Sequence, residues 1–327
     1  MRRKLSSPVL ASLCALASPL AAQEELRVTH DGLQGDLVGT LEGELRPDRP
    51  NILIIPGSGP TDRDGNNPLG IKAATYRLLA EGLAQQGFAT VRIDKRGMFA
   101  SASAIPDANA VTVADYVSDV AAWSSEMRRR GAGECVWLLG HSEGGVIAMA
   151  AAALDPAPYC GLLLVAAPGR NLGDVIRAQI AASPGAGFLL PQVDDIIARL
   201  KAGQSVPAGE IHPGLLPLFG PQVQGFVASL FQQDPSALLT AHDLPVLILN
   251  GRKDIQTPDS DAELLATARE DAELVLLENV NHVLKTVGGE DRAANLATYG
   301  DPDLPLAPGV IEAITEFVSE ATDQSGA

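Results

Sequence analysis

The sequence predicts an α/β protein with a mostly parallel sheet flanked by helices, and three observations support this fold class. Short apolar runs alternate with stretches of helical periodicity along most of the chain, as in successive βαβ units. The chain has 327 residues, 46% of them hydrophobic and 20% charged, so it can bury a large core and is neither disordered nor a coiled coil. The alternation lapses once, between residues 170 and 242, where we expect an insertion.

The strands and helices are expected in a regular order. An antiparallel entry strand at residues 36–45 begins a sheet of eight strands. The buried parallel strands that can be placed within this sheet cover residues 51–55, 89–93, 135–139, 161–167, 244–250 and 273–278. Helical periodicity covers residues 71–86, 260–268 and 308–321, and an Ala-rich helix ends at Leu154. A further helix opens with a capping box of Thr112 and Asp115 and ends at basic residues 128–130, which favour a helix C-terminus.

The stretch from residue 170 to 242 is rich in Gly and Pro and contains three short amphipathic pieces, at 175–182, 193–201 and 223–231. A structureless loop of that length is improbable inside a compact domain. We therefore expect a helical cap inserted between two strands of a single domain over residues 23–327. Such an insertion overhangs the carboxyl ends of the strands, where ligand pockets form.

The first 22 residues are expected to be a cleaved secretory signal. Basic residues at positions 2–4 precede an apolar stretch over residues 9–20, and Ala21 and Ala22 supply small side chains for cleavage. A membrane anchor is the weaker alternative, because the apolar stretch is shorter than the roughly 20 residues of a span and Pro19 interrupts it. The sequence therefore predicts a secreted or periplasmic protein, cleaved near Ala22.

Charge and cysteine content exclude several classes of protein. The chain has 24 basic and 40 acidic residues, which gives a formal net charge of −16. This charge argues against nucleic acid or an anionic membrane surface as the main partner. Three cysteines are too few for a disulfide scaffold. With aromatic residues at only 4%, a lipase acting on membranes is also disfavoured.

The strongest chemical signal is Gly140-His141-Ser142-Glu143-Gly144, which lies at a predicted strand-to-helix junction. A nucleophile in this position sits on a very tight turn, so its neighbours must be small enough for the strand and the helix to approach each other. The helix N-terminus then directs backbone N–H groups at a developing oxyanion. This context favours a nucleophilic Ser142 over a merely structural turn.

A nucleophilic serine needs a base and an orienting acid, which are expected downstream in the order Asp, His. His282 follows the last predicted strand, and the alternative is a surface loop histidine. Asp254 follows a buried strand at its carboxyl end, whereas the rivals Asp259 and Asp261 have the character of helix-start charges. The predicted catalytic residues are therefore Ser142, Asp254 and His282.

An oxyanion hole requires two N–H donors. One is expected to be the backbone of Glu143, directly after the nucleophile. The other is expected from the loop after the strand at 51–55, where we favour the Ser58 backbone and regard Gly59 as the rival.

The chain resembles the α/β-hydrolase superfamily, and within it the bacterial esterase and serine aminopeptidase-like branch. Three motifs in the same order carry this resemblance, GSGPTDRDGN at 57–66, DKRG at 94–97 and GHSEGG at 140–145. The contexts of Asp254 and His282 also match. The resemblance spans nearly all of the mature chain and implies the α/β-hydrolase fold with carboxylic ester hydrolysis, no cofactor and no metal.

One departure from the family pattern concerns the loop after DKRG. Related chains usually continue with a second glycine, roughly Gly-x-Gly-x-Ser, but here Phe99 stands at its place. Because this loop faces the active site in the family, Met98 and Phe99 are candidates for an acyl pocket. The alternative, equally weighted, is that they pack under the cap.

Two groups of charged residues each allow a structural and a functional interpretation. Asp62, Arg63 and Asp64 are expected to form a local salt-bridged network that fixes their loop, rather than a metal or substrate site. The Glu143 side chain could select cationic or amine substrates, although we favour a helix-start role for it.

Cys135 and Cys160 each lie seven residues before the predicted carboxyl-end positions of neighbouring parallel strands, at Ser142 and Ala167. Both sulfurs are therefore expected near the amino-terminal edge of the sheet. In an oxidising compartment they could form an intrachain disulfide. Two buried free thiols are the equally weighted alternative.

These features predict an exported serine hydrolase that cleaves short- to medium-chain carboxylic esters. A thioesterase or an aminopeptidase with the same triad is the alternative, and an aminopeptidase would need an acidic cap residue such as Asp194, Asp195 or Glu210. A non-catalytic binding protein is the hypothesis from another class of function. Loss of a triad member would indicate it, but all three residues are present. The sequence leaves the oligomeric state open and predicts no stable membrane insertion.

Overall fold

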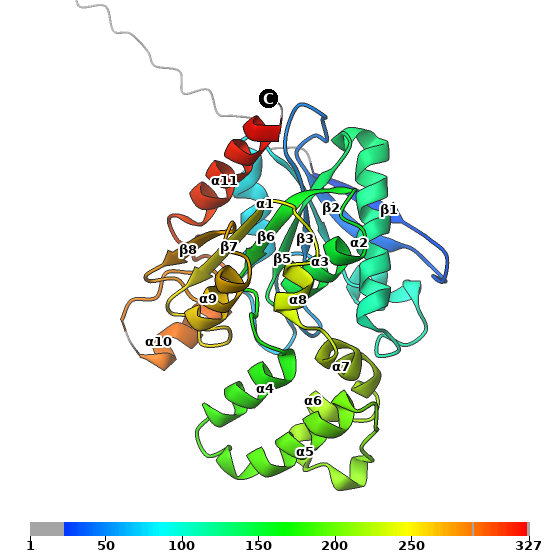
Figure 1. Cartoon of the computed structure of the whole chain (residues 1–327), viewed down its shortest axis with the longest axis vertical. Helices are drawn as coiled ribbons and strands as arrows, with labels where there is room; N and C mark the ends of the chain where they lie inside the picture. Colours follow the sequence, from blue (N-terminus) through cyan, green and yellow to red (C-terminus); the bar gives the residue numbers. More distant parts are fainter. Residues whose placement is uncertain (1–22, 290, 326–327) are drawn as a thin grey trace, which may run out of the picture.

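The computed structural model describes residues 23–289 and 291–325. Its centre is an eight-stranded sheet of order β1-β2-β4-β3-β5-β6-β7-β8, with helices on both sides (Figure 1). The first two pairings, β1–β2 and β2–β4, are antiparallel, and all others are parallel. The strands are β1 (Gln23–Val28), β2 (Leu37–Glu42), β3 (Asn51–Ile55), β4 (Ala89–Ile93), β5 (Val136–His141), β6 (Tyr159–Val165), β7 (Val246–Gly251) and β8 (Glu273–Leu277). The predicted fold class is confirmed.

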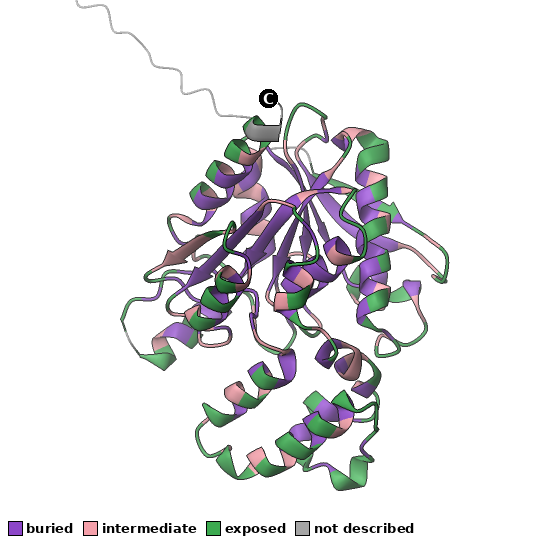
Figure 2. Cartoon of the chain, in the orientation of Figure 1, coloured by how far each residue is buried: buried purple, intermediate pink, exposed green. Residues whose placement is uncertain are grey.

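Two hydrophobic cores cover the two faces of the sheet. One face packs against α1 (Thr75–Gln85) and α11 (Val310–Ser325). The other packs against α2 (Val113–Met127), α3 (Glu143–Leu154), α8 (Pro235–Leu239) and α9 (Asp259–Ala268). The central strands are purple throughout their length in Figure 2, which shows that they are buried on both faces. Parallel strands buried in this way have continuous apolar sequences, which is why they could be placed from the sequence.

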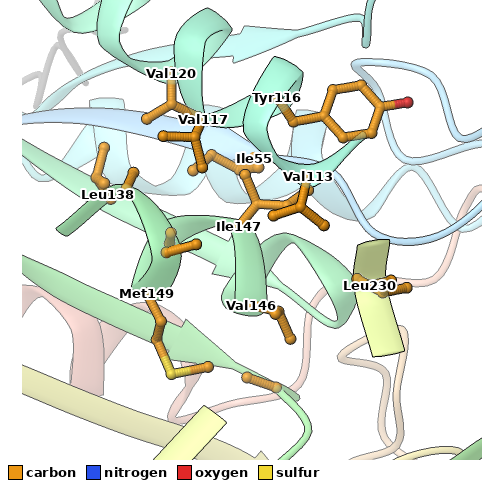
Figure 3. Packing of buried hydrophobic residues seen from close by; sticks show 14 of the residues in the cluster. Ile55, Val113, Tyr116, Val117, Val120, Leu138, Val146, Ile147, Met149 and Leu230 are labelled. Carbon is orange, nitrogen blue, oxygen red and sulfur yellow. The ribbon is translucent and has the colours of Figure 1, made fainter. Parts of the chain in front are cut away.

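Successive side chains of a strand enter opposite cores. In β3, Ile52 and Ile54 belong to the core beneath α1 and α11, whereas Leu53 and Ile55 belong to the core beneath α2 and α3. This is the period of two that a strand imposes. Figure 3 shows the second core, where Ile55 lies among apolar side chains of α2 and α3 such as Val117.

The cap lies between β6 and β7 in the chain. Figure 1 shows it as a group of helices at one end of the sheet. Its helices are α4 (Leu172–Ala181), α5 (Leu190–Lys201), α6 (Leu216–Phe219) and α7 (Gln224–Phe231), with short 3₁₀ turns between them. The Asn171 side chain donates to the carbonyl oxygens of Phe231 and Gln233 at 2.7 and 3.0 Å, which joins the entry and exit of the cap.

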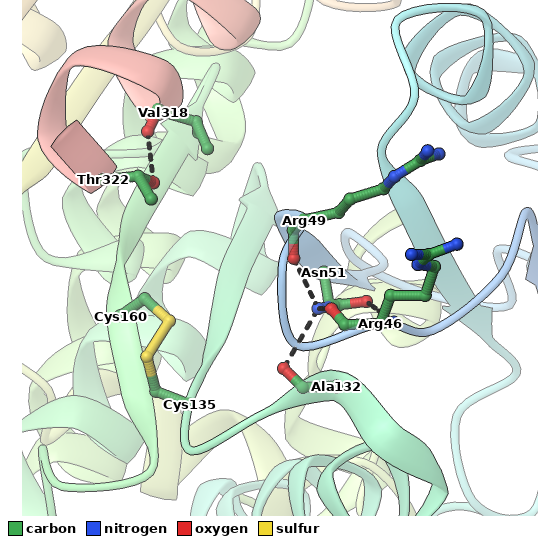
Figure 4. Close-up of a disulfide and its surroundings, with 8 residues drawn as sticks. All are labelled: Arg46, Arg49, Asn51, Ala132, Cys135, Cys160, Val318 and Thr322. Atoms are coloured by element: carbon green, nitrogen blue, oxygen red, sulfur yellow. Dashed lines mark hydrogen bonds between the residues drawn. A yellow bond between two sulfur atoms is a disulfide. The ribbon is translucent and has the colours of Figure 1, made fainter. Parts of the chain in front are cut away.

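A disulfide joins Cys135 to Cys160 at the start of β5 and β6 (Figure 4). It lies at the amino-terminal edge of the sheet, opposite to the edge where β5 ends at His141. Beside it the Asn51 side chain donates to the carbonyl oxygens of Arg49 and Ala132 at 2.7 and 3.0 Å. Of the two alternatives left open by the sequence, the structure has the disulfide.

The predicted strands at 51–55 and 89–93 agree with β3 and β4 residue for residue. Strand β1, at the antiparallel edge of the sheet, was not predicted. It has the pattern exposed-exposed-exposed-buried-exposed-buried, so only two of its side chains enter the core and the apolar signal is weak. The predicted secretory signal at residues 1–22 lies outside the described residues. Among those that are described, no single helix is long and apolar enough to span a membrane.

Candidate active site

Ser142 stands on a sharp turn between β5 and α3. Its backbone has φ 55° and ψ −125°, a combination that an ordinary residue adopts only at a cost of about 1–3 kcal/mol. The hydrogen bond from the Ser142 N–H to the Val165 carbonyl, at 3.0 Å, helps to hold this conformation. The side chain therefore lies beyond the carboxyl end of the central strand, with the first turn of α3 directly behind it.

The glycines around Ser142 allow this turn to pack. A Cβ atom on Gly144 would collide with the carbonyl oxygen of Ile55, at the end of the adjacent strand β3. A Cβ atom on Gly140 would collide with the carbonyl oxygen of Gly144 itself. Both positions have ordinary negative φ values, so the requirement is close approach of backbones and not a left-handed conformation.

His282 and Asp254 form a hydrogen-bonded pair. The Nδ1 atom of His282 lies 2.7 Å from Oδ2 of Asp254, and both side chains are buried. Since a carboxylate can only accept, Nδ1 carries the proton and Nε2 is left free to accept one. His282 and Ser142 line the same pocket. The structure thus brings together the three residues predicted to be catalytic, which lie at positions 142, 254 and 282 of the sequence.

Asp254 is held by donors from the residues that follow it. Its Oδ1 accepts the backbone N–H groups of Gln256 and Thr257 at 2.7 and 2.9 Å. The Thr257 hydroxyl oxygen lies 2.9 Å from Oδ2, the atom that faces His282. The same hydroxyl lies 2.9 Å from the carbonyl of Ala166. Thr257 was not predicted, although aspartates often accept the N–H group two residues on, as Asp254 does, and so form turns of this kind.

His141, next to the nucleophile, is buried and neutral. Its Nε2 lies 2.8 Å from the carbonyl oxygen of His282, so Nε2 is the donor. Its Nδ1 then accepts from the Tyr76 hydroxyl at 3.0 Å, and that hydroxyl oxygen accepts the Gly57 N–H at 2.8 Å. Burial and the neighbouring His282 lower the pKa of His141 to about 3. Tyr76 was not predicted, because no local pattern reveals a contact across 65 residues.

Ser58 and Glu143 are the predicted oxyanion donors. In residues 23–289 and 291–325 no acceptor pairs with the backbone N–H of either residue. Ser58 lines the pocket that contains Ser142, together with Gly57, while the rival Gly59 does not. Glu143 is the first residue of α3, and N–H groups in a first helical turn have no partner within the helix. The predicted donor at Ser58 therefore lies in the wall of the pocket, and the predicted donor at Glu143 directly follows Ser142.

The Glu143 carboxylate does not line this pocket. Its Oε1 lies 3.4 Å from the Lys95 ammonium, and both side chains are 3% exposed. A buried, paired carboxylate of this kind is not available to a substrate amine. The structure therefore gives no support to the role in amine selection that the sequence left open.

The charges of residues 62–64 form the local network that was predicted. Oδ1 of Asp62 accepts the N–H of Asp64 at 2.9 Å. The Arg63 N–H donates to Asp94 at 2.8 Å, and the Asp64 carboxylate pairs with Arg92 at 2.9 Å. These contacts tie the loop that carries Ser58 to the end of β4 and to the DKRG segment after it.

The pocket at Ser142 is small, with a volume of about 80 Å³. Its walls come from the 57–76 segment, from His141 and Gln256, and from the loop at His282 and Val283. The structure does not bring Met98 and Phe99 to this pocket, nor any residue of the described cap helices. The cap is connected to it through Gln179 of α4, whose amide donates to the carbonyl of Gln256 at 3.1 Å.

Phe99 occupies the position where the family pattern has glycine, and its φ is +47°. This is the left-handed region, which glycine adopts freely and other residues adopt at a cost. The side chain is 42% exposed. The loop thus keeps the backbone conformation that the family pattern implies, even though the glycine is absent.

The acidic cap residues proposed for an aminopeptidase are paired with arginines. Asp194 lies 2.5 Å from Arg177, and Glu210 lies 2.8 Å from Arg199, which also contacts Asp195 at 3.7 Å. None of the three acids lines the pocket of Ser142. Within the part of the chain that the structure describes, no group of three or more His, Cys, Asp or Glu side chains is arranged to hold a metal ion.

Solved structures of similar shape identify the fold. Est1E from Butyrivibrio proteoclasticus superposes with a TM-score of 0.55 at 17% identity, covering 91% of this chain and 99% of that one. A thermophilic esterase from Thermogutta terrifontis gives a TM-score of 0.56 at 19% identity with the same coverage. The chain has the α/β-hydrolase fold. At these identities the likeness establishes the fold alone.

Sequence comparison adds two similarities. The profile of the serine aminopeptidase family S33 matches residues 69–208, a segment that includes Ser142 but neither Asp254 nor His282. Esterase EstD from Thermotoga maritima is 25% identical over 279 residues, which are 83% of this chain and 62% of that protein. The chain therefore spans less than two thirds of that relative's length. Together these matches show that the chain is similar to an esterase and to the serine aminopeptidase family.

Proposed function

We propose that the protein is an exported serine hydrolase that cleaves short- to medium-chain carboxylic esters through an acyl-enzyme on Ser142. The observation that carries this proposal is the 2.7 Å contact between His282 Nδ1 and Asp254 Oδ2 beside a pocket that also contains Ser142. This contact leaves Nε2 of the imidazole as the proton acceptor, which is the arrangement that activates a serine hydroxyl.

The reaction follows from the chemistry of these groups. His282 removes the proton of the Ser142 hydroxyl as the oxygen attacks the ester carbonyl, and Asp254 stabilises the resulting imidazolium. The carbonyl oxygen becomes an oxyanion that the Ser58 and Glu143 N–H groups stabilise. His282 then protonates the leaving alcohol, and the acyl group stays on Ser142. Water activated by the same imidazole hydrolyses this acyl-enzyme and restores the serine.

An ester is favoured over a peptide with a free amino terminus. An aminopeptidase needs an anion near the scissile bond to hold the substrate amine. Asp194, Asp195 and Glu210 are paired with arginines outside the pocket, and the Glu143 carboxylate is paired with Lys95. The printed name of the Thermotoga maritima relative, an esterase, agrees with this choice. A thioester requires the same catalytic groups and remains the second candidate.

Export is part of the proposal because two independent features agree with it. The first 22 residues have the pattern of a secretory signal. The disulfide between Cys135 and Cys160 is of a kind that persists in oxidising compartments and is rare in the cytosol. Expression of the full chain in a bacterium should give a periplasmic protein that begins near Gln23, as determined by N-terminal sequencing. A cytoplasmic protein that retains residue 2 would overturn this part.

The catalytic proposal is tested with p-nitrophenyl acetate, butyrate and octanoate, alongside an acyl-CoA and an aminoacyl p-nitroanilide. We expect turnover of the acetate and butyrate esters, little with the anilide, and loss of turnover in Ser142→Ala with the thermal unfolding unchanged. Equal turnover by Ser142→Ala and the wild type would contradict a serine mechanism. Faster turnover of the acyl-CoA than of any ester would favour the thioesterase instead.

A further inference from the structure

Lys95 is a buried lysine beneath the loop that carries Ser58. The residue is 4% exposed and follows Asp94 in the DKRG segment, directly after β4. Its ammonium donates to the carbonyl oxygen of Gly57 at 2.7 Å and lies 3.4 Å from Oε1 of Glu143. The Tyr116 ring also faces it, with the ring centre 5.5 Å from Nζ. One buried cation thus contacts both segments that supply the oxyanion donors.

The contact with Gly57 acts directly on one of these donors. The Gly57 carbonyl and the Ser58 N–H belong to one peptide unit, and the described chain has no cis peptide bonds. In a trans peptide the C=O and N–H bonds point in opposite directions. An ammonium bound to the carbonyl oxygen therefore fixes the plane of the unit and holds the Ser58 N–H on the other side. The positive charge also polarises the peptide, which strengthens the N–H as a donor.

The contact with Glu143 acts on the residue that supplies the other donor. Glu143 begins α3 directly after the nucleophile, and its side chain reaches back to Lys95 across 48 residues. The same ammonium therefore fixes the position of the loop at Gly57 relative to the first turn of α3. The oxyanion hole depends on this relationship, because its two N–H groups must converge on one atom.

Stability alone does not account for a buried pair at this place. Two charges with side chains only 3% exposed lose their hydration, and such pairs are often no more stabilising than well-packed apolar side chains. Lys95 also donates to a carbonyl that a neutral donor could have satisfied. What a cation adds to this hydrogen bond is stronger polarisation of the peptide unit at Gly57 and Ser58.

We propose that Lys95 is the positioning residue of the oxyanion hole, where its ammonium orients and polarises the Gly57–Ser58 peptide and connects it to Glu143. This inference rests on the proposed serine hydrolase function. Lys95 touches no reacting atom, so its removal is expected to reduce the stabilisation of the transition state and to leave substrate binding largely unchanged.

The test uses the double variant Lys95→Met/Glu143→Gln, which removes the cation without leaving an unpaired buried carboxylate. For p-nitrophenyl acetate we expect kcat to fall about 10- to 100-fold with KM within about 3-fold of the wild type. This is less than the 10²–10³-fold loss that follows the removal of an oxyanion donor. A trifluoromethyl ketone, which forms an oxyanion on Ser142, should lose affinity by the same factor as kcat/KM. The single variant Lys95→Arg retains a cation and should recover part of kcat.

Arg269→Met is the matched control. Arg269 is another buried cation that donates to backbone carbonyls, those of Leu239, His242 and Leu244. Its acidic partner Asp271 is 71% exposed, so no buried charge is left unpaired. This variant should be destabilised, yet it should keep the kcat and the ketone affinity of the wild type, measured below its unfolding temperature.

The outcomes separate the inference from the function on which it rests. Wild-type turnover that depends on Ser142, together with a double variant whose kcat and ketone affinity are unchanged, overturns the role of Lys95 alone. An increase in KM without a fall in kcat overturns it as well. Absence of any Ser142-dependent turnover in the wild type removes the proposed function, and the inference with it.

Discussion

His141 Nε2 lies 2.8 Å from the carbonyl oxygen of His282, so the residue before the proposed nucleophile is bonded to the backbone of the proposed base. On its other side His141 reaches the Tyr76 hydroxyl, which accepts the N–H of Gly57. A neutral imidazole is required for this arrangement, because Nδ1 must accept a hydrogen bond while Nε2 donates one. The base and the oxyanion loop are thus connected through one buried histidine.

This requirement predicts a specific pH dependence of stability. The pKa of His141 is about 3 in the folded protein, whereas an unfolded histidine titrates near ~6.5. The contribution of the neutral His141 to the free energy of unfolding is fully present above pH ~6.5. It decreases as the pH falls toward 3, because the unfolded chain binds a proton that the native state does not. Between pH 7.5 and 5 the loss is about 2 kcal/mol. Urea unfolding of the wild type and His141→Gln at both pH values measures it.

The glutamine variant has no group that titrates at this position. It should be less stable than the wild type at pH 7.5, and the difference between the two proteins should shrink by about 2 kcal/mol at pH 5. A difference that stays constant between these pH values would show that His141 does not titrate as its burial implies.

Thr257 is expected to hold Asp254 against His282. Its hydroxyl lies 2.9 Å from Oδ2, the oxygen that faces the imidazole. Replacement by the isosteric valine should lower kcat about 10-fold, equivalent to about 1.4 kcal/mol in the transition state, while Thr257→Ser should stay close to the wild type. Steady-state kinetics with p-nitrophenyl acetate measures this effect. A valine variant with the kcat of the wild type would mean that the hydroxyl donates its hydrogen bond to the Ala166 carbonyl, which is equally near.

Phe99→Gly should stabilise the protein. Phe99 adopts a φ of +47° with a side chain that is 42% exposed, so glycine would relieve backbone strain and sacrifice little burial. The left-handed conformation costs an ordinary residue roughly 1–2 kcal/mol, part of which is offset by the greater freedom of glycine in the unfolded chain. We expect a gain of about 0.5–1 kcal/mol in the unfolding free energy. Phe99→Ala keeps the strain, and if it stabilised the protein equally, relief of φ could not be the cause.

The disulfide should matter for stability and not for catalysis. It joins residues 25 apart in the sequence, and a loop of this size contributes about 3.5 kcal/mol to the unfolding free energy. The double variant Cys135→Ala/Cys160→Ala should lose about that amount in chemical denaturation and retain kcat at 25 °C. The bond lies at the start of β5, whereas Ser142, the proposed nucleophile, follows its end. A large fall in kcat with little loss of stability would argue against this separation.

Much of the fold could be predicted because its signals are local. The strand at 51–55 is apolar after Asn51, and the strand at 89–93 alternates apolar residues with Thr90 and Arg92. The turn at Ser142 requires small neighbours within a few residues. Strand β1 was missed because only its last residues alternate between exposed and buried positions.

The contacts that support the site could not be predicted because they are distant in sequence. Lys95 reaches Gly57 across 38 residues, and Tyr76 reaches His141 across 65. Composition and periodicity say nothing about such pairs. Met98 and Phe99 were candidates for an acyl pocket because of the family resemblance, with packing under the cap as the alternative, and neither of them lines the pocket of Ser142.

The central claim is that Ser142 is a nucleophile activated by His282. The most direct measurement is reaction with a fluorophosphonate, followed by peptide mass spectrometry of the wild type and of Ser142→Ala and His282→Ala. The account predicts one modification in the wild type, located on Ser142, none at that site in the alanine variant, and a rate at least 100-fold slower in His282→Ala. A wild type that stays unmodified, or that is modified at another residue with equal speed in all three proteins, would contradict it.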